Sequence, residues 1–197
     1  MSPSRALPAR SLAEVYLYLM VTPCAACEEG PLRAGDATSR QESGRLRVEV
    51  PVTCAACGQR GSRHFELPLE ARDSMHQNRI SADGSVSPII DVAQWMTLFR
   101  MIAEAADRQS DKIEARRLGY EAAQCLEEAL KFYVADNDLP PARAFFTDKS
   151  RALLREHPEY FSRQRLLELR AKLPALNVME RKLRGRRTPR RRRWGLF

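Results

Sequence analysis

The sequence has no apolar run long enough to cross a membrane and no recognisable secretory signal. The apolar run at residues 15–21 contains seven residues, whereas a membrane-spanning helix needs about 20. Residues 1–10 contain two prolines and two arginines, and no cleavage-like site precedes the first cysteine. We therefore expect a cytoplasmic protein with no transmembrane segment.

The sequence also lacks the short motifs that mark common catalytic and nucleotide-binding sites. It has no phosphate-binding glycine loop and no dinucleotide-binding glycine pattern. The His-Glu-x-x-His motif of metalloproteases and the Gly-x-Ser-x-Gly motif of serine hydrolases are absent as well. We expect that the protein is not an enzyme.

Large aromatic residues are scarce in the N-terminal third of the chain. Aromatic residues make up 7% of the sequence, and both tryptophans follow residue 90. A small N-terminal unit with few large aromatic side chains needs another source of stability, and a bound metal is the usual one. The five cysteines of a chain expected inside the cell favour thiolate chemistry over disulfides.

Four of the five cysteines fall in two copies of the tetrapeptide Cys-Ala-Ala-Cys. A spacing of two residues lets one tight turn aim two thiolates at the same ion, and two such turns complete a tetrahedral shell. The motif therefore predicts one structural Zn²⁺ ion per chain. Its predicted ligands are Cys24, Cys27, Cys54 and Cys57.

Two other chemistries use the same cysteine spacing. An iron ion in a rubredoxin-like site needs the same four thiolates, and a redox-active dithiol needs one Cys-x-x-Cys pair. The redox dithiol usually lies at the N-terminus of a helix, and neither copy here is followed by a helical pattern. His64 and His76 follow the second copy, but four thiolates already complete a shell, so we expect ordinary histidines there.

The first 72 residues have a β-rich pattern around the two motifs. We expect a strand at residues 11–22, a polar loop at 30–44, a half-buried strand at 45–53 and a short strand at 64–69. The strand at 45–53 is the clearest, because apolar residues alternate with polar ones along it. The resulting order is strand, cysteine turn, strand, cysteine turn, strand.

This arrangement resembles zinc ribbons over about residues 12–72. The second motif, Cys54 to Cys57 followed by Gly58 and a leucine-bearing strand, is similar to the bacterial CpXC-type zinc-ribbon proteins, whose function is not settled. The chain lacks the proline that such families usually place inside the motif. The resemblance implies metal binding and a recognition role rather than catalysis.

After residue 87 the apolar spacing changes from two to about 3.6 residues, which predicts helices. The first begins near Pro88 with Ser87 as its cap, and the second follows a cap at Asp111. Two shorter helices are expected at 148–156 and 163–173. Cys125 lies on the apolar face of the second helix, so we expect it in the core. Trp95 is also expected in the core.

The C-terminal segment carries the positive charge of the protein. The net charge is +8, and residues 181–197 contain nine Lys or Arg and no acid, which leaves 24 basic and 25 acidic residues in 1–180. We expect such a cluster to bind RNA or DNA through release of counterions from phosphates. The alternatives are an anionic membrane surface, an acidic protein, or a solvated tail with no specific partner. The arginines expected to bind such polyanions are Arg184, Arg186, Arg187, Arg190, Arg191, Arg192 and Arg193.

The sequence therefore predicts an α+β protein with three parts. These are an N-terminal zinc ribbon at residues 11–72, a helical bundle at 87–178 and a disordered basic tail at 179–197. The expected function is a non-catalytic adaptor or a nucleic-acid-associated protein. One alternative is a scaffold whose helical domain binds a protein partner or a second copy of the chain; another, minor one is a cysteine redox sensor.

Overall fold

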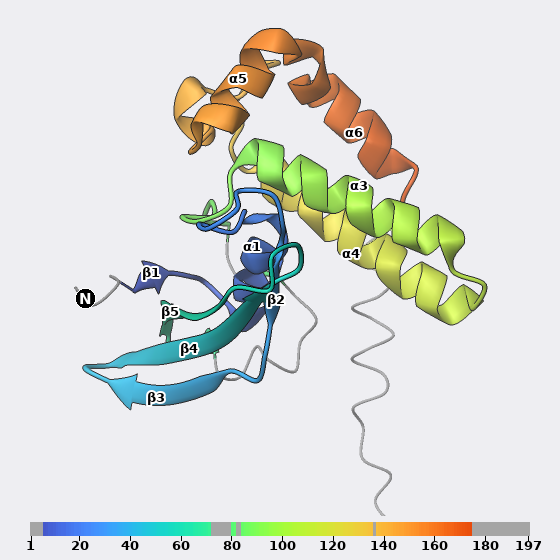
Figure 1. The fold of residues 1–197 in the computed structure, drawn as a ribbon. Helices are drawn as coiled ribbons and strands as arrows, with labels where there is room; N and C mark the ends of the chain where they lie inside the picture. Colours follow the sequence, from blue (N-terminus) through green and yellow to red (C-terminus); the bar gives the residue numbers. More distant parts are fainter. Residues whose placement is uncertain (1–5, 72–79, 82–83, 136, 175–197) are drawn as a thin grey trace, which may run out of the picture.

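The structure is a computed structural model of the 197-residue chain. It describes residues 6–71, 80–81, 84–135 and 137–174. The predicted basic tail, including all seven arginines between positions 184 and 193, lies outside the described residues. Over the described ranges the chain is an α+β protein, with one mixed sheet and five α-helices (Figure 1). The α+β class expected from the sequence is confirmed.

A five-stranded sheet forms the N-terminal part of the fold. Its strands lie in the order β1-β5-β4-β2, and β3 also pairs with β4. Only the β1–β5 pair is parallel. The strands are β1 (Leu7–Pro8), β2 (Leu32–Ala34), β3 (Thr38–Glu42), β4 (Arg45–Cys54) and β5 (Arg60–Pro68).

Strand β4 has the alternation that its sequence predicts. Leu46, Val48, Val50 and Val52 are all buried on one side of the sheet, since successive side chains of a strand point to opposite faces. The strand predicted at 64–69 is also present, although β5 begins earlier, at Arg60. The N-terminal strands at 45–53 and 64–69 are thus confirmed in type and approximate position.

The strand predicted at residues 11–22 is wrong, because this segment is helix α1 (Leu12–Val21). The hydroxyl of Ser11 accepts a hydrogen bond from the backbone N–H of Glu14 and caps the helix. Val15 and Leu19 are buried, and the ring of Tyr18 meets that of Phe65 of β5 edge-on. A short run that is apolar on every side has no readable period, so capping and packing decide its structure.

The polar loop predicted at residues 30–44 is also wrong, because it contains β2 and β3. All five residues of β3 are exposed, so the strand needs no apolar residue and is stabilised mainly by its backbone pairing with β4. The turn between them places Ser43 at φ 49° and Gly44 at φ 76°. Two consecutive positive φ angles are the geometry of a type I′ hairpin turn.

Within the described residues, four α-helices follow the sheet in the chain. They are α3 (Val92–Arg108), α4 (Lys112–Leu130), α5 (Asp148–Glu156) and α6 (Arg163–Ala171), with short 3-10 helices η1 (Ala142–Ala144) and η2 (Pro158–Phe161). Asp111 caps α4 as predicted, through the backbone N–H of Ile113. The predicted start of α3 is wrong, because its cap is Asp91 rather than Ser87. The Ser87 hydroxyl instead accepts from the N–H groups of Ile89 and Ile90 in the preceding turn.

A continuous buried cluster includes side chains of both the sheet and the helices. Trp95 and Cys125 are completely buried, which confirms both as core residues. Helix α1 contacts β2 on one side and α3 on another (Figure 1). None of the helices in the described part of the chain is long and apolar enough to cross a membrane.

Buried charges connect the N-terminal segment to helix α4. Arg10 donates to Glu14 of α1 at 2.6 Å and to Glu128 of α4 at 2.8 Å. Glu14 is completely buried and Glu128 is 5% exposed. Lys131 also donates to Glu128, at 2.7 Å. Each buried carboxylate therefore has a cation at hydrogen-bond distance, as burial of charge requires.

Asp91 connects α3 to the segment before α5. Its Oδ1 accepts from the backbone N–H of Gln94 at 2.9 Å, and its Oδ2 accepts from the backbone N–H of Phe146 at 2.9 Å. Gln94 in turn accepts from the N–H of Asp91, which completes a capping box. The side chain is fully buried, so no water can replace these bonds.

We predict that Asp91→Ala lowers the free energy of unfolding by about 2–4 kcal/mol, because it removes both the cap of α3 and the buried acceptor of the Phe146 N–H group. Urea denaturation followed by circular dichroism measures this loss. The matched control is Asp111→Ala, which removes an exposed cap and costs about 1 kcal/mol. Equal losses in the two variants would contradict a special role for Asp91.

Candidate metal centre

The two Cys-Ala-Ala-Cys motifs lie in two turns that the fold brings together. The first turn, residues 24–30, follows the C-terminus of α1, and the second, residues 54–59, connects β4 to β5. Pairing of Leu32 in β2 with Cys54 in β4 sets one turn beside the other. The backbone N–H of Ala55 also donates to the carbonyl of Pro31 at 3.0 Å. We call these turns knuckle one and knuckle two.

The knuckles share a pattern of backbone hydrogen bonds. In knuckle one the N–H of Cys24 donates to the carbonyl of Gly30 at 3.0 Å. In knuckle two the N–H of Cys54 donates to the carbonyl of Gln59 at 2.8 Å. Knuckle one therefore closes one residue later than knuckle two.

Each knuckle has a residue in the left-handed conformation directly after its second cysteine. Glu28 has φ 59° and Gly58 has φ 72°. Their N–H groups donate back to the carbonyls of Cys24 and Cys54, at 2.8 Å and 3.1 Å. Glycine adopts this conformation without steric cost, whereas a glutamate does not. Knuckle one therefore has the less favourable backbone.

The four sulfur atoms are spaced as the vertices of a metal-thiolate tetrahedron. All of them lie within 4.8 Å of one another. The Sγ atoms of Cys24 and Cys57 are 3.8 Å apart, and those of Cys27 and Cys54 are 3.6 Å apart. A tetrahedron with zinc–sulfur bonds of about 2.3 Å has edges of about 3.8 Å. A disulfide needs about 2.05 Å, so these cysteines are free thiols.

Backbone N–H groups of the knuckles point at the buried sulfurs. The N–H of Ala26 lies 3.4 Å from the Sγ of Cys24. The N–H groups of Ala56 and Cys57 lie 3.4 Å from the Sγ of Cys54. Such donors stabilise a thiolate, because they favour its negative charge over the neutral thiol.

The pKa values of the thiols reflect both the stabilising N–H groups and the neighbouring thiols. The N–H groups of Cys57 and Ala56 lower the pKa of Cys54 to about 6. The N–H of Gln59 also lowers the pKa of Cys57, but the surrounding thiols of Cys54 and Cys27 outweigh it and raise that pKa to about 12. Four thiolates this close repel one another, and a divalent cation is what removes the repulsion.

Gly30 is the point of closest approach between the knuckles. A Cβ atom at this position would lie 2.7 Å from the backbone nitrogen of Ala56 and 2.7 Å from the Sγ of Cys54. Real Cβ contacts are not this short, so only glycine fits. No sequence motif marks Gly30 as a site residue; its place three residues after Cys27 is the available signal.

The site is buried on one side and open on the other. Cys24 and Cys54 are each 3% exposed, Cys27 is half-buried and Cys57 is exposed. Within the described part of the chain, no histidine belongs to the group of candidate metal ligands. His64 lies on β5 opposite Glu49 of β4, and the position of His76 is outside the described residues.

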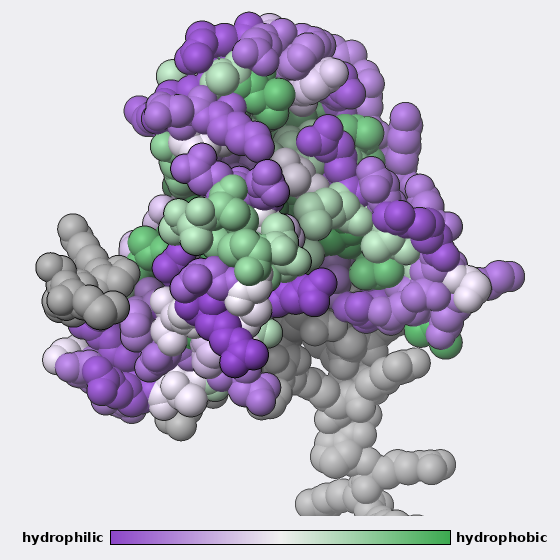
Figure 2. Space-filling model, viewed as in Figure 1, coloured by the Kyte–Doolittle hydropathy of each residue, from purple (hydrophilic) through white to green (hydrophobic). Residues whose placement is uncertain are grey.

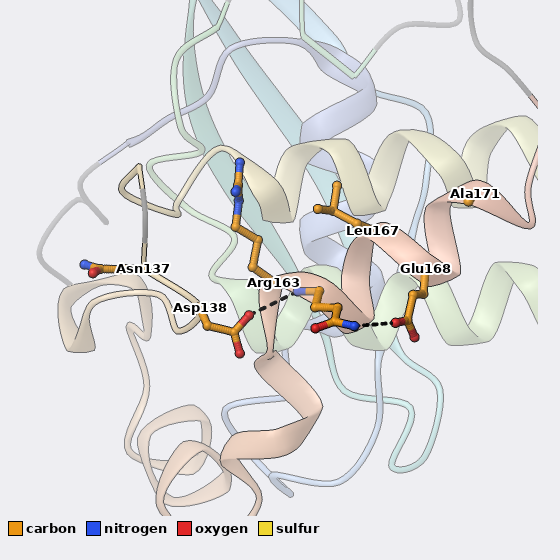
Figure 3. A pocket seen from close by; sticks show the side chains of 7 residues that line it. Asn137, Asp138, Arg163, Leu167, Glu168 and Ala171 are labelled. Carbon is orange, nitrogen blue, oxygen red and sulfur yellow. Dashed lines mark hydrogen bonds between the residues drawn. The ribbon is translucent and has the colours of Figure 1, made fainter.

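A separate hollow lies between helix α6 and residues 137–138, in the segment that follows α4 (Figure 3). Its volume is about 550 Å³. The carboxylate of Asp138 accepts from the N–H of Gln164 at 3.1 Å, and the Gln164 amide donates to Glu168 at 3.0 Å. These groups cap and brace α6, and the lining contains no cysteine or histidine. It is lined by Asn137, Asp138, Arg163, Gln164, Leu167, Glu168 and Ala171.

Comparison with known proteins gives no relatives: no family model, no curated protein and no solved structure matches this chain. The similarity to CpXC-type zinc ribbons therefore rests on the cysteine motif alone. What the geometry itself establishes is a group of four cysteines able to hold one metal ion.

We predict that Gly30→Ala weakens zinc binding by about 10- to 100-fold, the usual effect of disturbing the residues that position metal ligands. Competition with a fluorescent zinc chelator measures the affinity. Gly61→Ala is the matched control, because a Cβ there would meet nothing within 4 Å. Unchanged zinc affinity in Gly30→Ala would show that the knuckles do not approach as described.

Proposed function

We propose that this chain is a non-catalytic protein that holds one structural zinc ion and associates with RNA or DNA. The observation that carries the first half is the spacing of the Sγ atoms of Cys24, Cys27, Cys54 and Cys57, which all lie within 4.8 Å. The second half is supported by the nine basic residues and absence of acids in 181–197.

A closed structural zinc site fits this donor set better than a catalytic zinc site or a redox dithiol does. Zinc prefers a closed tetrahedron of thiolates in structural sites. A catalytic zinc site keeps one position for water, and four cysteine ligands leave none. A redox dithiol lies at a helix N-terminus, whereas knuckle one follows the C-terminus of α1 and knuckle two joins two strands. These observations support a structural role.

The proposed metal would crosslink two parts of the N-terminal region. It would join the end of α1 to the β4–β5 turn, two parts of the chain about 30 residues apart in sequence. In zinc-finger peptides such a site contributes roughly 10–16 kcal/mol, which becomes folding free energy. We interpret residues 11–72 as a zinc ribbon in which helix α1 replaces the first strand.

We predict about one zinc atom per chain in protein purified without added metal. Elemental analysis measures the content, and removal of zinc with a strong chelator at pH 7 should unfold the region around the sheet. Cys54→Ser should lower the zinc content, whereas Cys125→Ala, which alters the buried cysteine outside the site, should keep it. Iron in place of zinc, or a folded protein with no metal, would overturn the proposal.

We predict binding of the full chain to RNA and DNA oligonucleotides at low salt, without strong preference for sequence, because phosphate contacts carry no base information. Replacement of Arg190, Arg191, Arg192 and Arg193 by Gln should reduce the slope of log affinity against log salt by about 3. Fluorescence anisotropy at salt concentrations from about 50 to about 300 mM measures this slope.

The matched control replaces four exposed arginines of the folded part, Arg33, Arg60, Arg100 and Arg116, by Gln. It changes the net charge equally but leaves the C-terminal cluster intact. Equal effects of the two variants would show that only net charge matters. Absence of binding by the unaltered chain at low salt would overturn the nucleic-acid role.

A further inference from the structure

The positive charge of the chain extends beyond the C-terminal cluster into the folded part. Residues 139–174 contain eight Lys or Arg and four Asp or Glu. Residues 1–138 contain 16 basic and 20 acidic residues. The division between an acidic N-terminal part and a basic C-terminal part therefore falls before η1, within the described structure.

These basic residues gather on one end of the molecule. Helices α5, η2 and α6 form a layer over the pair of α3 and α4 (Figure 1), and Figure 2 shows this end covered mainly by hydrophilic residues. Six of the basic side chains are exposed and make no ion pair with any residue of the described structure. They are Arg143, Lys149, Arg155, Arg163, Arg165 and Lys172.

A stack of planar groups lies on the same surface. The rings of His157 and Tyr160 are 4.8 Å apart and nearly parallel, at 14°. The guanidinium of Arg165 lies 5.1 Å from the centre of the Tyr160 ring. Tyr160 is 36% exposed, and the His157 side chain is 45% exposed. Exposed aromatic rings and guanidinium planes are the groups on which unpaired bases stack.

We propose that the surface formed by α5, η2 and α6 binds single-stranded nucleic acid. Bases stack on the cluster of His157, Tyr160 and Arg165, and phosphates pair with flanking cations such as Lys149 and Arg155. The proposal rests on the nucleic-acid role proposed above and extends it from residues 181–197 to a folded surface. Helix α6 ends at Ala171, so the two regions are nearly contiguous along the chain.

The structure also indicates where phosphate does not bind. The N-terminus of α6 would ordinarily attract an anion, but the Asp138 carboxylate already accepts from the N–H of Gln164 there, at 3.1 Å. Asp138 also accepts from the hydroxyl of Ser162 at 3.2 Å. The carboxylate repels a phosphate from that end, which leaves the cations and the planar cluster as the contact surface.

The test measures binding of full-length protein to a fluorescein-labelled 15-nucleotide oligouridine and to a 15-base-pair RNA duplex. Tyr160→Ala should weaken oligouridine binding by about 5- to 100-fold, the range for loss of one stacked base. It should leave duplex binding unchanged, because paired bases do not stack on the surface. Tyr160→Phe keeps the planar ring and should retain wild-type affinity.

Two further variants separate stacking and charge from loss of folding. Tyr160→Leu keeps apolar bulk without a planar ring and should weaken oligouridine binding like Tyr160→Ala. Arg155→Gln with Arg165→Gln should reduce the salt slope by about 1.4, whereas Arg33→Gln with Arg100→Gln tests the loss of two exposed charges elsewhere and should keep the slope near that of wild type. Thermal unfolding confirms that each variant is folded.

The outcomes distinguish this inference from the proposed function. If wild type binds oligouridine and the Tyr160 and Arg155/Arg165 variants bind equally well, the folded surface is not involved, while the C-terminal role stands. Equal weakening of duplex and oligouridine by Tyr160→Ala would overturn base stacking. If wild type binds neither oligonucleotide at low salt, the nucleic-acid role and this surface both fail.

Discussion

Four sulfur atoms meet where the end of helix α1 reaches the turn between β4 and β5. Two turns surround them, with similar backbone hydrogen bonds and one left-handed residue in each. Gly30 lies at the contact between the two turns. As thiolates, sulfurs 3.6–3.8 Å apart would repel one another, and a bound cation would remove that repulsion. Because one turn follows α1 and the other joins β4 to β5, such an ion would tie the end of α1 to the sheet.

The second support is the set of buried charges around Arg10. The four cysteines lie at the C-terminal end of α1, whereas Arg10 and Glu14 connect its N-terminal end to Glu128 of α4. Between the two ends, Val15 and Leu19 are buried in the apolar core. Through these contacts, the short helix α1 packs between the sheet and the later helices of the chain.

Periodicity predicted most of the fold where one face of an element is buried. Strand β4 alternates clearly, and α5 begins and ends at the predicted residues, Asp148 and Glu156. Periodicity failed where the two faces of an element do not differ in polarity. Apart from Glu14, α1 is apolar around its whole circumference, and β3 is exposed throughout. Each pair of cysteines could be predicted to meet, because a spacing of two residues fits one tight turn. Two such turns complete one tetrahedral shell, which predicts that the pairs meet each other. The role of Gly30 could not be predicted, because it depends on Ala56 and Cys54 across the fold.

The unequal burial of the cysteines has a kinetic consequence for any metal held between them. Cys24 and Cys54 are enclosed by protein, whereas Cys57 faces solvent and Cys27 is half-buried. A competing ligand would approach such an ion from the open edge, so exchange would begin at the exposed sulfurs while the enclosed pair still held it. A centre of this shape would combine tight binding with transfer to an acceptor through a shared intermediate, without prior unfolding.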